Sequence, residues 1–139
     1  MSVRYMLDTD TASYVIKGGH PDLDRRLASA PLDDLCVSIV TRAELLYGVR
    51  LKPGPHRLAR VVAQFLARVP SLPWDEAAAD QFATIAAELH TSGTQIGTFD
   101  TMIAAHALAN NAVVVTNNTA HYSRVSGLAL ENWAQSAAQ

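Results

Sequence analysis

The sequence has a single cysteine, Cys36, among its 139 residues. One cysteine excludes an internal disulfide and a cysteine-based zinc site. It lies in the apolar run 35–40, where a small buried side chain is the simplest interpretation. We therefore expect neither a covalent cross-link nor a thiolate metal centre.

Long hydrophobic runs are also lacking. No stretch approaches the roughly 20 apolar residues that span a bilayer, and the N-terminal residues reach Asp8 after only a few apolar positions, too few for a signal peptide. These absences predict a cytoplasmic protein that makes no membrane contact.

The five histidines form no helical pair at the spacing of metal ligands. Core or surface roles are the simpler interpretation for all of them. Only His106, six residues after Asp100, and His121, close to Asn118, lie near residues of interest below.

Basic residues are scarce in the second half of the chain. Residues 1–68 hold ten of the 11 Lys and Arg, whereas residues 69–139 hold Arg124 alone. Between Arg42 and Arg68 the only acid is Glu44. This basic stretch is either a solvated helical face or an edge that contacts phosphates or an acidic partner.

What the sequence does contain is enough apolar material for one packed domain. Hydrophobic residues make up 49% and charged residues 17%, which favours a globule over disorder. The length fits a single domain over residues 1–139, with a polar tail from about residue 135.

Apolar strand patterns alternate with helical patterns along this domain. Strands are expected at 4–7, 35–40, 113–115 and 128–130, and helices at 10–17, after Pro21, and at 41–49, 56–68, 75–93 and 98–110. Asp10, a Thr41–Glu44 capping box, Asp75 and Thr98 are the expected helix starts, and Pro53-Gly54-Pro55 the expected break. The pattern predicts an α/β fold whose mainly parallel sheet has about four to five strands flanked by helices.

Polar residues follow the expected strands or begin the helices beyond them: Asp8, Glu44, Asp100 and Asn118. Each alone can be explained as a turn or helix-start residue. In a parallel sheet, however, sites form beyond the carboxyl ends of the strands. Carboxylates gathered there would repel one another unless a cation lay between them. Oxygen ligands select Mg²⁺, for which Mn²⁺ can substitute, and such an ion suits phosphoryl chemistry.

Four ordered blocks at residues 6–10, 38–48, 96–108 and 114–119 resemble PIN-domain proteins, and specifically the VapC toxins of type II toxin–antitoxin modules. The resemblance covers nearly the whole chain and implies a single PIN-like domain. It also implies a toxic Mg²⁺-dependent endoribonuclease that hydrolyses RNA phosphodiester bonds, with tRNA or ribosomal RNA as substrate. A cognate VapB-type antitoxin and a homodimer are the implied partners.

The resemblance also implies roles for individual residues. Asp8, Glu44 and Asp100 take the positions of the metal-binding catalytic acids, and Asn118 takes the polar catalytic position after the last core strand. Many relatives place a glutamate about three residues further on, where this chain has His121.

Two other classes fit part of the pattern. The stretch 8–11 after an apolar strand also suits a haloacid-dehalogenase-like phosphatase, but that chemistry needs a later lysine, and Lys17 and Lys52 come too early. The second alternative is a catalytically inactive PIN fold that acts as a binding module. The presence of all three acids counts against it.

Overall fold

The computed structural model describes residues 3–52, 54 and 56–134. Its five strands form one sheet in the order β3-β2-β1-β4-β5, and all neighbouring pairs are parallel. The strands are β1 (Tyr5–Leu7), β2 (Leu35–Ser38), β3 (Ser71–Leu72), β4 (Val113–Val115) and β5 (Leu130–Glu131). The predicted α/β fold with a parallel sheet is confirmed.

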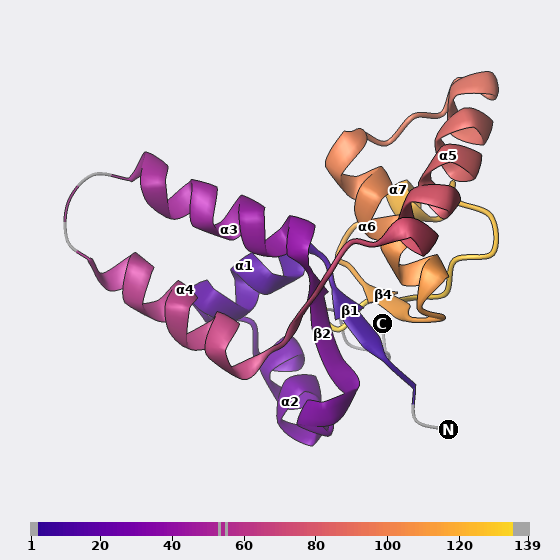
Figure 1. The fold of residues 1–139 in the computed structure, drawn as a ribbon. Helices are drawn as coiled ribbons and strands as arrows, with labels where there is room; N and C mark the ends of the chain where they lie inside the picture. The colour runs from indigo at the N-terminus through magenta and orange to yellow at the C-terminus, as the bar shows by residue number, and fades with distance from the viewer. Residues whose placement is uncertain (1–2, 53, 55, 135–139) are drawn as a thin grey trace.

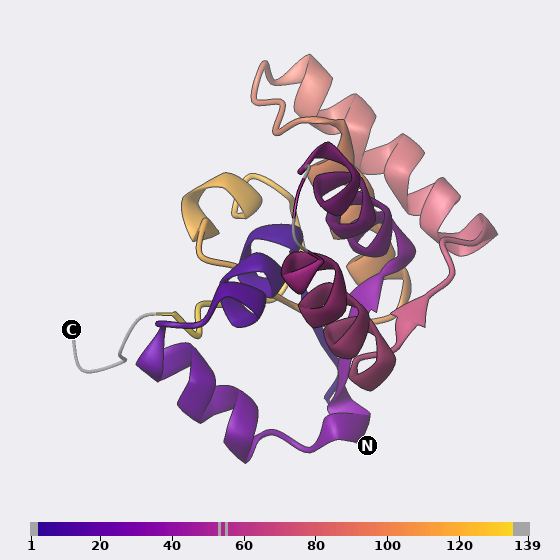
Figure 2. The same cartoon turned by 90° about the vertical axis from the view of Figure 1, so that its left-hand side faces the viewer.

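Helices cover both faces of this sheet (Figures 1 and 2). They are α1 (Thr9–Lys17), α2 (Pro21–Ser29), α3 (Ile39–Leu51), α4 (Arg57–Arg68), α5 (Glu76–Thr91), α6 (Thr98–Ala109) and α7 (Thr119–Tyr122), with the 3₁₀ helix η1 (Leu32–Asp34) before β2. None of the helices within the described ranges is long and apolar enough to cross a membrane.

The sheet is buried on both faces because neighbouring strand residues point to opposite sides. One set packs against α5, α6 and α7, and the other packs against α1, α2 and α4. The first set is Met6, Cys36 and Val114, and the second is Leu7, Val37 and Val115. Cys36 is thus a core residue, as predicted, and burial raises the pKa of its thiol to about 11.

Two helix starts differ from the predictions in a way that matters for the site. Asp8, not Asp10, caps α1, because its Oδ1 accepts a hydrogen bond from the Thr11 N–H at 2.8 Å. Helix α3 begins at Ile39, where Ser38 caps it by accepting from the Val40 N–H at 3.1 Å.

The prediction of a Thr41–Glu44 capping box is therefore wrong, and β2 is shorter than predicted. The β-branched side chains of Ile39 and Val40 favour a strand locally, but the Ser38 hydroxyl begins the helix there. This earlier start turns Glu44 into a residue of the second helical turn.

Smaller differences concern the ends of some elements and the shortest elements. Gly97, with φ 94°, precedes α6, so Thr98 is its first residue and not its cap. Strand β5 begins two residues later than predicted and ends one residue later. The short elements β3, η1 and α7 were not predicted, because segments of two to four residues show no clear periodicity. Pro53, Pro55 and the polar tail lie outside the described residues.

Candidate active site

The order of the strands places a site beyond the carboxyl end of β1. From β1 the chain builds β2 and β3 on one side and then crosses to build β4 and β5 on the other. Such a reversal of strand order opens a crevice at the carboxyl edge of a parallel sheet. Asp8 directly follows β1, and Thr116 directly follows β4, so both lie at this crevice.

Asp8 is a buried carboxyl group, with 3% of its surface exposed. Burial raises its pKa, and hydrogen bonds from the Thr116 hydroxyl and the Thr11 N–H oppose that effect. Asp10 adds a repulsive charge. Ionised Asp8 is therefore costly in the metal-free protein, and a cation beside it would remove that cost.

Glu44 approaches this position from α3. Its Oε1 accepts a hydrogen bond of 2.6 Å from the Thr9 hydroxyl, which also lies 3.1 Å from the Thr41 hydroxyl. Burial raises the pKa of Glu44, the Thr9 hydrogen bond lowers it, and the charges of Asp100, Asp10 and Asp8 raise it further. Asp8 and Asp100 are thus both close enough to Glu44 to raise its pKa.

Asp100 comes from the first turn of α6, and its side chain is 39% exposed. The helical turn that contains Asp100 is closed by the Thr101 hydroxyl, which donates to the Gly97 carbonyl at 2.6 Å. On its other side, His121 Nε2 lies 3.2 Å from Asp100 Oδ2. Asp100 therefore sits at the mouth of the site, where it is open to solvent.

A buried hydrogen bond links the helices that carry Glu44 and Asp100. His106 of α6 places Nδ1 2.8 Å from the hydroxyl of Ser38, the residue that caps α3. Burial lowers the pKa of His106, so the ring is neutral at physiological pH, and the hydroxyl can donate to it while accepting from Val40 N–H. His106 is a core residue that fixes the two helices relative to each other.

The structure brings Asp8, Glu44 and Asp100 together, but it does not bring the Asn118 side chain to them. Asn118 is exposed at the start of α7, and no hydrogen bond from its side chain to the acids occurs among the described residues. His121 makes the contact with Asp100 instead.

Four neighbours of the acids were not predicted as site residues: Thr9, Asp10, Thr116 and Tyr122. Thr9 and Asp10 adjoin Asp8, and Thr116 ends the last core strand, so their places along the chain gave a signal. Tyr122 gave none. Its hydroxyl is buried and has no hydrogen-bond partner among the described residues, and burial together with the charges of Asp8 and Asp100 raises its pKa.

The acids suit a divalent cation in their chemistry. They offer only oxygen ligands, and two of them have pKa values raised by burial. No group of three acidic, histidine or cysteine side chains in the described ranges is yet close enough to enclose an ion. Asp100 is exposed enough to turn toward one.

The hydrogen bond from Thr9 to Glu44 gives a first prediction. Thr9→Val keeps the shape of the side chain but removes the donor, so Glu44 loses the contact that orients it. RNA cleavage is expected to fall about 10- to 100-fold, the usual cost of losing a group that orients a metal ligand. Initial cleavage rates at matched protein concentration measure this effect.

The matched control is Thr84→Val. The Thr84 hydroxyl is exposed on α5 and bonds only to the Asp80 carbonyl of its own helix, so this variant should cleave at the normal rate. Equal activity of Thr9→Val and Thr84→Val would show that Thr9 has no part in orienting Glu44.

Comparison with known proteins shows the family of the chain. Residues 5–128 match the PIN domain family. The chain is 38% identical to a "tRNA(fMet)-specific endonuclease VapC" of Shigella flexneri over 94% of this chain and 98% of that protein. It is also 38% identical to "Ribonuclease VapC2" of Haemophilus influenzae, with the same two shares covered.

A solved structure extends the likeness to the fold. In DNA-bound VapBC from Salmonella typhimurium, one chain superimposes with a TM-score of 0.89 at 36% identity, covering 95% of this chain and 99% of that one. Fold, acids and family match together define a metal-dependent nuclease with a PIN domain. The chain belongs to the VapC ribonucleases, the toxins of type II toxin–antitoxin systems. The haloacid-dehalogenase alternative is thereby removed, and so is the inactive binding module.

Proposed function

We propose that this VapC ribonuclease uses Mg²⁺ held by Asp8, Glu44 and Asp100 to cut a structured tRNA, in the cytoplasm. The observation that carries the proposal is the approach of three carboxylates from separate segments to one sheet edge, two of them with pKa values raised mainly by burial. The Shigella relative named for tRNA(fMet) supports the substrate class.

Each residue contributes a separate task. When bound, the ion would neutralise the carboxylates, acidify a water and stabilise the charge that develops on the phosphate. Asp8 is held rigid by its helix cap, and Glu44 is oriented by Thr9. We assign Asn118, exposed beyond β4, to contact with the scissile phosphate through its amide N–H groups.

Metal removal tests this proposal. Purified protein free of antitoxin should cleave total cellular RNA with Mg²⁺, lose all cleavage in EDTA, and regain it with Mg²⁺ or Mn²⁺. The 5′ ends of the products should map to one or a few loops of tRNA. Undiminished cleavage in EDTA would contradict the metal site, and cuts confined to ribosomal RNA would contradict the substrate class.

The antitoxin is assigned to an apolar groove on the opposite side of the sheet from α5 and α6. Residues of α1, α2 and α4 line it, and its volume is about 290 Å³. The side chains that line it include Val15, Ile16, Leu27, Leu32 and Phe65. An amphipathic segment of a VapB-type partner fits such a groove, and the VapBC complex from Salmonella supports this class of partner.

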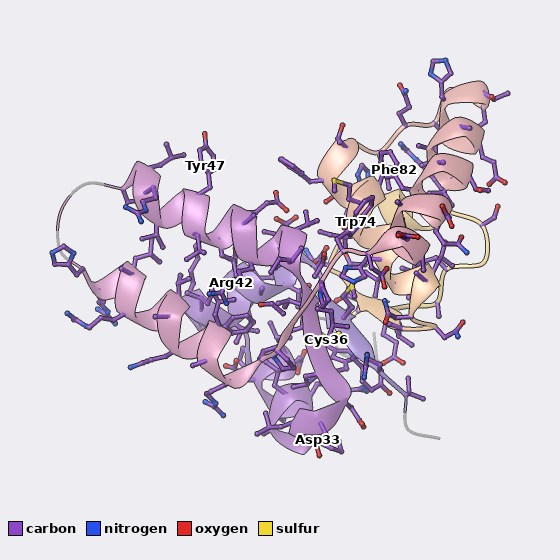
Figure 3. The ribbon with its side chains drawn as sticks, in the orientation of Figure 1. Asp33, Cys36, Arg42, Tyr47, Trp74 and Phe82 are labelled. Carbon is purple, nitrogen blue, oxygen red and sulfur yellow. The ribbon has the colours of Figure 1, made fainter. Side chains whose placement is uncertain are left out.

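A second apolar surface is assigned to a homodimer. A hollow of about 660 Å³ lies between α3 and α6 and is lined by Ile39, Tyr47, Phe99 and Met102 together with Glu44. Tyr47 is 65% and Phe99 55% exposed, and Figure 3 shows Tyr47 projecting from α3. Large exposed hydrophobic side chains gathered in one place are typical of a protein interface.

This assignment predicts that Tyr47→Asp makes the protein monomeric, because a charge would be buried without a partner at the centre of the interface. Light scattering after size exclusion should report half of the normal mass. The control Val3→Asp, at an exposed apolar residue far along the chain from α3, should leave the mass unchanged. A normal protein that is already a monomer would contradict the assignment.

A further inference from the structure

The short helix α7 brings two adjacent side chains, His121 and Tyr122, toward Asp100. His121 Nε2 lies 2.7 Å from the Ile96 carbonyl and 3.2 Å from Asp100 Oδ2. A carbonyl oxygen only accepts, so Nε2 carries the hydrogen and donates it to Ile96. The positive end of the same N–H lies beside the Asp100 carboxylate.

The Ile96 carbonyl is a well-placed anchor for Asp100. Ile96 is buried and precedes Gly97, whose φ of 94° turns the chain into α6. Arg124, just beyond α7, reinforces the connection by donating to the Gln95 carbonyl at 3.3 Å. The segment before α6 thus accepts hydrogen bonds from His121 and Arg124 at two successive carbonyls. Asp100 lies one helical turn further on.

The Tyr122 hydroxyl is the second donor. It is buried and makes no hydrogen bond of good geometry among the described residues, but the Asp100 carboxylate is close enough to raise its pKa both as a charge and as a hydrogen-bond acceptor. A buried hydroxyl without a partner costs free energy. A phenol is protonated at neutral pH, and a slight movement of Asp100 would let it donate to that carboxylate.

We propose that His121 and Tyr122 are positioning residues for the Asp100 carboxylate, so that α7 supplies positioning groups to the site and not a further ligand. His121 Nε2–H holds the Ile96 carbonyl before α6 and keeps its dipole beside the carboxylate, and the Tyr122 hydroxyl supplies a hydrogen bond to it. The inference rests on the proposed metal site and adds to it.

Substitutions at His121 separate a donor from a ligand. Gln can present an N–H at the place of Nε2, Ala removes the group, and Glu offers acceptors only. Binding of Mn²⁺, followed by the loss of the free-ion signal in electron paramagnetic resonance, should weaken about 10- to 100-fold in His121→Ala and His121→Glu. His121→Gln should stay within a few-fold of the normal protein. Tighter Mn²⁺ binding by His121→Glu would overturn the proposal, because it would show that this position favours a ligand.

Tyr122→Phe tests the second donor without changing the ring. Because the hydroxyl is buried without a partner, the metal-free variant should melt at the same or a higher temperature. Mn²⁺ binding should nevertheless weaken about tenfold, and kcat should fall while KM for RNA stays constant. Unchanged Mn²⁺ affinity in this variant would show that the hydroxyl does not position Asp100.

The control is Ser123→Ala, the next residue along, whose exposed hydroxyl donates to the Ala120 carbonyl. It should bind Mn²⁺ normally. If the normal protein binds no Mn²⁺ at all, the metal site itself fails. If the normal protein binds and His121→Ala binds equally well, only the positioning role fails.

Discussion

Asp8→Asn is expected to abolish RNA cleavage while raising the melting temperature of the metal-free protein. Asparagine keeps the oxygen that accepts the Thr11 N–H, so the cap of α1 survives. The charge that would hold the ion is lost, and at least a 100-fold fall in cleavage rate is expected, on the order of the cost of losing a strong electrostatic contact in a transition state.

The gain in stability follows from the direction of the pKa shift. Burial raises the pKa of Asp8 above its value in the unfolded chain, so the folded state holds the proton more tightly. This group therefore favours folding at low pH, and its contribution is lost as pH rises through the raised pKa. Without metal, the melting temperature of the normal protein relative to Asp8→Asn should fall as pH rises above about 4.

Thermal denaturation in EDTA between about pH 5 and pH 8 measures this difference, and saturating Mg²⁺ should reverse it. The control is Asp80→Asn, an exposed acid on α5, which should change neither property. An Asp8→Asn protein that cleaves RNA at the normal rate would remove Asp8 from the catalytic site. One that melts lower in EDTA would show that its carboxylate stabilises the fold.

Leu32→Arg is expected to free the toxin from its antitoxin. Leu32 lies in η1 at the groove between α1, α2 and α4, and it is 53% exposed, so the substitution should leave the fold intact. An arginine there would place an unpaired charge in the apolar contact. Antitoxin affinity should fall on the order of 100-fold, the range of a residue central to an interface.

Calorimetric titration with the cognate antitoxin measures the affinity, and RNA cleavage with the antitoxin present measures the escape from inhibition. Cleavage without antitoxin should be normal. Leu51→Arg is the matched control, because Leu51 is equally large, 61% exposed, and lies at the end of α3 outside the groove. Normal antitoxin binding by Leu32→Arg would place the antitoxin elsewhere.

The acids could be predicted from sequence because each is adjacent to a strong local signal. Asp8 ends a short apolar strand, and Asp100 begins a helix, so general knowledge of parallel sheets was enough to place them at one edge. Glu44 was placed at this edge as part of a capping box that the structure does not contain, since the cap of its helix is Ser38 and not Thr41.

The contacts that support the acids could not be predicted in this way. Thr9 and Glu44 are separated by 35 residues, and Ser38 and His106 by 68 residues. No local pattern encodes such pairs, because the packing of α1, α3 and α6 against the sheet brings them together. The role of α7 was missed for a related reason, since four residues are too few to show a helical period.

The central position of β1 means that its two neighbouring strands are synthesised at very different times. Tyr5 pairs with Leu35 on one side and with Val113 on the other, so the first strand is made more than 100 residues before its second neighbour. Until β4 has been made, one edge of β1 stays unpaired. Distant strand pairing of this kind forms late. We therefore expect the three acids of a growing chain to come together only after β4 has been made.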